Sequence, residues 1–82
     1  MSQKLFIGGL SWGTRNDGLR AAFENFGEVV SAEVVMDRVT GRSRGFGFVT
    51  YSDVESAENA RQQMHGTELD GRTIIVDLAK AK

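Results

Sequence analysis

The sequence predicts an α+β fold in which two helices cover one face of a four-stranded antiparallel sheet. Two observations indicate it. The expected elements follow the order strand, helix, strand, strand, helix, strand, and the helical stretches are amphipathic while the strand stretches alternate or are short and apolar. The chain has 82 residues, 40% of them hydrophobic, which suffices for one small core. We therefore expect a single domain.

The first half of the chain supplies a strand, a helix and a second strand. Residues 4–10 (KLFIGGL) are short and apolar and include two glycines near their end, which is typical of a strand. Thr14 and Asp17 have the spacing of a capping box, and the apolar residues after them recur at helical spacing until Gly27. Residues 29–37 are rich in valine and predict the second strand.

The second half repeats this pattern. Residues 44–51 alternate between aromatic and small side chains, which predicts the third strand. Ser52 and Glu55 have the spacing of a capping box and predict the start of the second helix. Asp70 with Gly71 predicts a turn, and residues 73–78 predict the fourth strand. This order of elements is that of the ferredoxin-like fold, whose two helices leave one sheet face uncovered.

The composition excludes several classes of protein. Without cysteine the chain has neither disulfides nor a thiolate metal site. It contains no apolar run near the roughly 20 residues that span a bilayer and no signal-peptide pattern, so we expect an intracellular protein in the cytoplasm, the nucleus or an organelle. The lone His65 is expected to be exposed or to contact the end of the second helix. No zinc-ligand set or catalytic triad stands out, so we expect neither a cofactor nor catalysis.

The charges are segregated although their sum is small. The formal net charge is -1. Residues 38–44 carry three arginines and no acid, whereas residues 53–70 carry five acids against Arg61. A near-neutral total can therefore hide one basic face and one acidic face.

The third strand indicates which side chains occupy the uncovered face. Its alternation sends Arg44, Phe46 and Phe48 to one side of the sheet and Gly47 and Val49 to the other. Val49 suits the core, and we expect Gly47 to leave room for a helix there. This assignment places two phenylalanines and an arginine on the solvent side.

The first strand adds a third ring. If Leu5 and Ile7 are core residues, Phe6 lies on the uncovered face. The alternative, in which all three phenylalanines are buried, would also bury Lys4 and Arg44, and neither strand offers an acid to pair with them. Burying an unpaired charge costs several kcal/mol. The exposed arrangement is therefore the prediction.

An exposed aromatic surface edged by cations fits single-stranded nucleic acid. Each base that stacks on an aromatic ring contributes about 1–3 kcal/mol. The phosphates require cations, which Arg44, Lys4 and the terminal Lys80 and Lys82 could supply. A single strand can splay its bases onto a sheet, whereas a duplex cannot.

Two motifs carry a resemblance to a known family. Residues 44–51 (RGFGFVTY) fit every position of the octamer of the RNA recognition motif, and residues 5–10 (LFIGGL) fit its companion hexamer, about 40 residues earlier. The chain resembles this family over nearly its whole length, and most of all its small glycine-rich and cold-inducible members. The resemblance implies one such domain over residues 1–82, with a core at about residues 4–79. It also implies a monomer that handles single-stranded RNA and uses no membrane or small-molecule substrate.

The resemblance also implies a role for each residue of the octamer and hexamer. Phe6 and Phe48 would each stack one base. Phe46 would insert between the sugars of neighbouring nucleotides. Arg44 would pair with a phosphate.

Charged residues outside the two motifs are further candidates. In similar domains, positions equivalent to Lys4 and Lys80 add contacts, and Arg42 would flank the bound strand. Asp77 lies near a position that often reads bases through hydrogen bonds. By alternation, Asp77 and Glu33 both point to the uncovered face, where an acid repels phosphate but accepts hydrogen bonds from base amino groups.

Several alternatives stay open at this point. Trp12 could stack a base, but packing at the entrance to the first helix is the prediction. The fold could serve instead as a protein-interaction module that uses the acidic side of its second helix. Single-stranded DNA could also bind, because stacking ignores the sugar. Family resemblance points only loosely to RNA chaperoning, stability, splicing or editing as the process.

Overall fold

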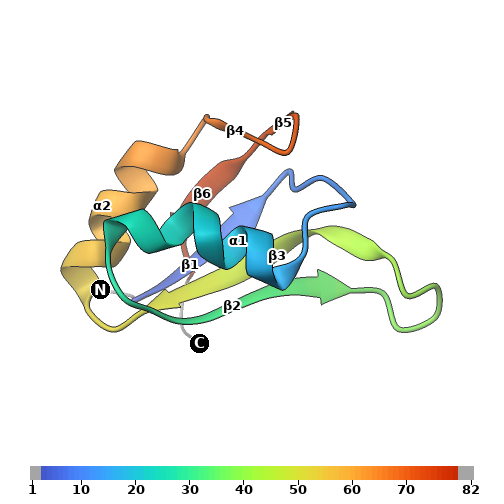
Figure 1. Ribbon diagram of the computed structural model, residues 1–82, viewed down its shortest axis with the longest axis horizontal. Coiled ribbons are helices and arrows are strands. Elements are labelled where there is room, and N and C mark those ends of the chain that lie inside the picture. Colours follow the sequence, from blue (N-terminus) through green and yellow to red (C-terminus); the bar gives the residue numbers. More distant parts are fainter. Residues whose placement is uncertain (1–2, 80–82) are drawn as a thin grey trace.

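The computed structural model describes residues 3–79 and contains the predicted two layers. One antiparallel sheet has the strand order β2-β3-β1-β6. Its strands are β1 (Lys4–Gly8), β2 (Val29–Met36), β3 (Ser43–Tyr51) and β6 (Ile75–Leu78). The helices α1 (Asn16–Phe23), followed by the short turn η1 (Glu24–Phe26), and α2 (Val54–Met64) lie on one face of this sheet (Figure 1). The predicted ferredoxin-like fold is confirmed.

Both helices begin differently from the predicted capping boxes. The N-cap of α1 is Arg15, and the Thr14 hydroxyl donates instead to Asp70 Oδ2 at 2.6 Å. The N-cap of α2 is Asp53, one residue later than predicted, and its carboxylate accepts from the Ser56 backbone N–H. A carboxylate at this position satisfies a free N–H and also faces the positive end of the helix dipole.

A short hairpin lies between α2 and β6 that the sequence pattern does not indicate. It pairs β4 (Glu68–Leu69) with β5 (Arg72–Thr73). Its turn residues Asp70 and Gly71 have φ of 52° and 83°, the combination that a tight two-residue hairpin requires. The predicted turn is therefore confirmed. The fourth strand of the main sheet begins later than predicted because Thr73 pairs with Glu68 instead.

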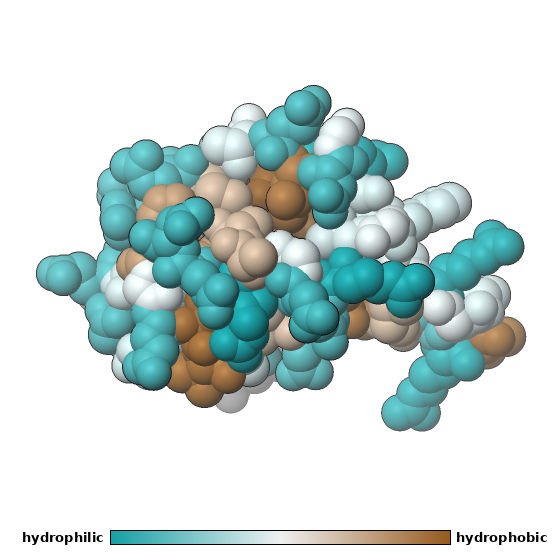
Figure 2. Space-filling view, viewed as in Figure 1, coloured by the Kyte–Doolittle hydropathy of each residue, from teal (hydrophilic) through white to brown (hydrophobic). Residues whose placement is uncertain are grey.

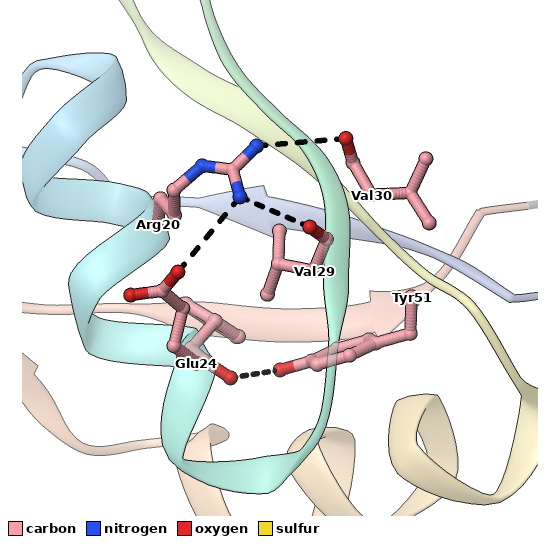
Figure 3. A network of polar contacts seen from close by, with 6 residues as sticks. Arg20, Glu24, Val29, Val30 and Tyr51 are labelled. Atoms are coloured by element: carbon pink, nitrogen blue, oxygen red, sulfur yellow. Dashed lines mark hydrogen bonds and ion pairs between the residues drawn. The ribbon is translucent and has the colours of Figure 1, made fainter.

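The core lies between the sheet and the two helices. Leu5 and Ile7 of β1 are fully buried there, as predicted, together with Leu19 and Phe23 of α1. Tyr51 at the end of β3 is also buried, and its hydroxyl donates to the Phe23 carbonyl oxygen at 2.6 Å (Figure 3). Burial raises the pKa of Tyr51 well above its usual value.

Side chains of α1 cover backbone groups of β2, which is an edge strand. Arg20 donates to the carbonyl oxygens of Val29 and Val30 at 3.0 and 3.5 Å (Figure 3). The Val34 N–H donates to Asn16 Oδ1 at 2.8 Å. These bonds occupy groups that a free strand edge would otherwise offer to another chain.

Gly47 is buried for a reason that differs from the prediction. A Cβ at this position would collide with the Glu33 carbonyl oxygen and lie 3.1 Å from Val34 Cα. The close neighbour is therefore the backbone of β2 and not a helix. The register between β2 and β3 shifts just beyond this contact, between Val34 and Met36.

Candidate nucleic-acid interface

Four side chains form a row across the whole sheet, on the face that the helices leave open. The register pairs Glu33 with Phe48, Phe48 with Phe6, and Phe6 with Asp77. Residues paired directly across antiparallel strands point to the same face. The row therefore places two aromatic rings at the centre of the sheet and one carboxylate at each end. This confirms the predicted orientation of Glu33 and Asp77.

A third ring completes an aromatic cluster on this face. Phe6, Phe46 and Phe48 are all partly buried, and their ring centroids lie 5.6 Å (Phe6–Phe46), 5.9 Å (Phe6–Phe48) and 6.2 Å (Phe46–Phe48) apart. These tilted and edge-to-face contacts stabilise the rings relative to one another. Gly8 makes room for them, since a Cβ there would lie 3.0 Å from Cε2 of Phe6. We call these three rings the aromatic platform.

Two cations lie on the rim of the aromatic platform. Lys4 Nζ lies 4.7 Å from the ring centroid of Phe48, and Arg44 Cζ lies 5.8 Å from that of Phe46. Both residues are exposed. Contacts of this kind contribute about 0.5–1 kcal/mol at exposed sites. The predicted placement of both cations beside the rings is confirmed.

The two carboxylates keep acceptor capacity toward solvent. Asp77 Oδ1 accepts from the Leu78 N–H at 2.8 Å, which fixes the carboxylate and leaves Oδ2 pointing away from that bond. Both Asp77 and Glu33 are exposed. An ionised carboxylate only accepts hydrogen bonds, so both ends of the row favour ligand groups that donate hydrogen bonds.

Ile75 also belongs to this face, although neither motif marks it. It is 53% exposed and lies opposite Gly8 in the register of β1 and β6. Its two-residue spacing from Asp77 on the same strand predicts this placement, which is confirmed. It extends the apolar surface beside the aromatic platform.

The loop between β2 and β3 is held by Asp37. Its carboxylate accepts from the N–H groups of Val39 and Thr40, and its own N–H donates to the Arg42 carbonyl oxygen at 2.7 Å. The hydrogen bonds from Val39 and Thr40, with a smaller contribution from the charge of Arg44, lower the pKa of Asp37. In Figure 1 the loop projects beyond the sheet, and Arg42 is exposed at its base.

Three further sequence expectations have different outcomes. Lys80 lies outside the described residues, which end at Ala79, whose N–H donates to the Lys4 carbonyl oxygen at 2.9 Å. The prediction that Trp12 packs at the entrance of α1 is wrong, because this side chain is 69% exposed. His65 is exposed, as expected, and its Nδ1 accepts from the Val76 N–H.

Other kinds of site find little support among residues 3–79. No cluster of histidine or acidic side chains there could hold a metal ion, and none of their helices has the length and apolarity to cross a bilayer. A shallow depression of about 400 Å³ lies beside α2, lined by Phe26 and polar residues such as Glu55 and Glu58. Hydrophilic side chains cover most of the helical side of the molecule (Figure 2).

Comparisons with known proteins agree with this geometry. Residues 5–75 match the family model of the RNA recognition motif. The chain is 61% identical over 79 residues to "Glycine-rich RNA-binding protein 4, mitochondrial" of Arabidopsis thaliana, covering 96% of this chain and 58% of that protein. It is 54% identical over 82 residues to "Small RNA-binding protein 11, chloroplastic" of the same plant, covering 100% of this chain and 56% of that protein. The chain thus spans somewhat more than half the length of these relatives.

Solved structures share the fold closely. The crystal structure of RNA Binding Protein PG1 superposes with a TM-score of 0.93 at 38% identity, covering 99% of this chain and 98% of that one. The second RRM domain of the yeast poly(U)-binding protein Pub1 superposes with a TM-score of 0.88 at 37% identity, covering 96% of this chain and 95% of that one. Together with the family match over residues 5–75, these likenesses place the chain in the RNA recognition motif family.

Proposed function

We propose that the protein binds single-stranded RNA on the open face of its sheet. The observation that carries this proposal is the aromatic platform, whose three rings lie within 6.2 Å of one another on the uncovered face. Rings in this position lie outside the core and present flat surfaces to bases. The family is one of binding domains, and the function is binding rather than catalysis.

The three rings contact different parts of the RNA. Phe6 and Phe48 each stack one base, and Phe46 inserts between the sugars of neighbouring nucleotides. A base that stacks on Phe48 displaces Lys4 from the ring. Stacking contributes about 1–3 kcal/mol, whereas an exposed cation over a ring contributes about 0.5–1 kcal/mol, so the exchange is favourable. Lys4, once displaced, is close enough to the ring's edge to meet a phosphate.

The cations hold the phosphates. Arg44 takes one phosphate at the rim of the platform, while Lys4, Arg42 and Lys80 supply further positive charge along the strand. With three such contacts, the logarithm of the binding constant falls with the logarithm of the salt concentration at a slope of about -2. Two or three stacked bases, offset by the ordering of a flexible strand, correspond to a dissociation constant on the order of micromolar.

The two carboxylates give the surface a base preference. Glu33 and Asp77 flank the stacked bases and repel phosphates, so the backbone of the strand runs elsewhere. They accept hydrogen bonds from the amino groups of adenine, cytosine and guanine. Uracil lacks an amino group, and its single N3–H donor lies between two carbonyl oxygens that a carboxylate repels. We therefore infer a preference for bases with amino groups at these positions.

The wider setting of the function follows from the relatives. Their names describe glycine-rich and small RNA-binding proteins of mitochondria and chloroplasts, which supports an intracellular RNA-handling role for this chain, in an organelle or elsewhere in the cell. Single-stranded DNA binds the same rings, because stacking does not require the 2′-hydroxyl. The protein acts as a monomer. The shallow depression beside α2 offers little apolar surface, which disfavours the helical face as the main interface.

A titration with a fluorescently labelled RNA hexanucleotide tests the proposal. Phe48→Ala is expected to weaken binding by about 1–3 kcal/mol because one stacking ring is lost, whereas Phe48→Tyr keeps the ring and most of the affinity. Val30→Ala is the control, since Val30 is 59% exposed on β2 away from the open-face row. Equal affinities for Phe48→Ala and the wild type, with both proteins folded, would contradict the proposal.

A further inference from the structure

Trp12 is an exposed indole on a turn that is firmly held. It is the only tryptophan in the chain, and 69% of its surface is exposed. The Thr14 N–H donates to the Ser11 carbonyl oxygen at 3.1 Å, and the Gly13 N–H donates to Ser11 Oγ at 3.2 Å. Thr14 is buried, and its hydroxyl donates to Asp70. The turn thus presents a large aromatic side chain to solvent from an anchored base.

The turn lies at the end of the sheet where the aromatic platform ends with Phe46. Gly8, the last residue of β1, pairs with Phe46 in the register. Two residues later, the Leu10 N–H donates to the Gly45 carbonyl oxygen at 2.8 Å, which ties the chain to β3. Trp12 follows two residues after Leu10, so their Cα atoms lie within about 7.6 Å of each other.

Positive charge gathers at the same end of the molecule. The loop after β1 and the loop between β2 and β3 project from this end (Figure 1). Arg38, Arg42 and Arg44 are exposed there. Among residues 3–79 the ion pairs are Arg20–Glu24 and Arg61–Glu58, so acids do not neutralise these three arginines by direct pairing. A strand of phosphates that leaves the platform past Phe46 meets these cations at the end of the molecule from which the Trp12 loop projects.

We propose that Trp12 is a fourth stacking position, which takes the base of the nucleotide beyond Phe46 at this end of the sheet. This inference rests on the proposed RNA-binding function. The bound strand is then at least one nucleotide longer than the aromatic platform alone accommodates. A nucleobase is the occupant that fits, because the exposed indole follows β1 at the end of the sheet that also carries Phe46 and the three exposed arginines.

The test compares a short and a longer RNA. The probes are a trinucleotide and a hexanucleotide of one base type, measured by isothermal titration. Trp12→Ala is expected to weaken binding of the hexanucleotide by about fivefold to about a hundredfold. The affinity for the trinucleotide should stay within about twofold of the wild-type value. Because Trp12 is the sole tryptophan, its emission is a direct second readout. The hexanucleotide is expected to quench this emission and to protect the indole from acrylamide.

Four variants separate the possible outcomes. Phe48→Ala must weaken binding of both oligonucleotides, and if it does not, the proposed function itself fails. If Phe48→Ala weakens binding of both oligonucleotides while Trp12→Ala leaves the hexanucleotide affinity unchanged, the function stands and the fourth position is overturned. An indole that stays accessible to acrylamide in the saturated wild-type complex would also overturn it. Trp12→Phe should retain most of the affinity, and Val39→Ala, at a residue that is 93% exposed on the neighbouring loop, should retain all of it.

Discussion

Phe6 and Phe48 are direct partners across β1 and β3, and their rings meet edge to face with centroids 5.9 Å apart. The hydrogen-bonded register of the two strands sets this spacing, so the rings are positioned before any ligand arrives. Two bases can therefore stack side by side at little cost in ordering the protein. The same pairing places Glu33 and Asp77 just outside the rings.

Loss of both central rings should weaken RNA binding by less than the sum of the two single losses. Phe6→Ala and Phe48→Ala each remove one stacked base, worth about 1–3 kcal/mol. Because the rings also contact each other, each single variant loosens the remaining ring, and the effects of neighbouring residues are not additive. Isothermal titration of the four proteins in this cycle measures the coupling. Wild-type affinity in the folded double variant would remove the rings from the interface.

Arg44→Ala should flatten the salt dependence of RNA binding. If Arg44 holds one phosphate, its removal lowers the steepness of the log–log slope by about 0.7 from a starting value of about -2. Arg61→Gln, on α2 beside Glu58, is the matched control, since it also removes one positive charge but lies on the helical side. Binding isotherms at several salt concentrations give both slopes. The phosphate role of Arg44 is wrong if the two variants change the slope equally.

Asp77→Asn should shift base preference toward uracil. The carboxylate only accepts hydrogen bonds, whereas an amide also donates and can pair with the uracil carbonyl oxygens. The change in relative affinity is expected to be about 1 kcal/mol, the contribution of one hydrogen bond. Competition between cytidine and uridine hexanucleotides measures it. An unchanged ratio would show that Asp77 does not contact bases.

Tyr51→Phe should destabilise the fold without affecting RNA recognition. The variant leaves the Phe23 carbonyl oxygen without its hydroxyl donor, which costs about 1–2 kcal/mol of unfolding free energy. Tyr51 is the only tyrosine and lies on the core side, opposite the rings. Chemical denaturation and RNA titration of the same variant separate the two effects. An affinity loss at temperatures where the variant is fully folded would contradict this separation.

The same residue predicts a loss of stability at alkaline pH. Burial raises the pKa of Tyr51 in the folded state above its unfolded value of about 10. Its contribution to the unfolding free energy is therefore complete below pH 10 and declines as the pH rises further, because the unfolded state releases the proton first. Urea denaturation between pH 8 and pH 11 should show a steeper decline for the wild type than for Tyr51→Phe. Parallel declines would refute this cause.

Sequence pattern was sufficient for the parts of the molecule that depend on near neighbours. The two-residue period of residues 44–51 predicted that Phe46 and Phe48 face away from the core, since the pleat sends alternate side chains to opposite faces. The cost of burying Lys4 and Arg44 without acids decided which face that was. The order of the two helices and the four strands of the main sheet likewise follows from local periodicity, and it was predicted correctly.

Contacts between residues far apart in the chain determined the features that the sequence pattern did not predict. Thr14 has a capping spacing, yet its hydroxyl bonds to Asp70, 56 residues away, because the β4–β5 hairpin folds back onto this turn. Gly47 is required by the backbone of β2, and Trp12 is left exposed at the end of the sheet. Local pattern carries no information about which distant group will lie beside a side chain. The three-dimensional packing alone settles whether a hydroxyl caps a helix or joins two loops, and whether an indole is covered.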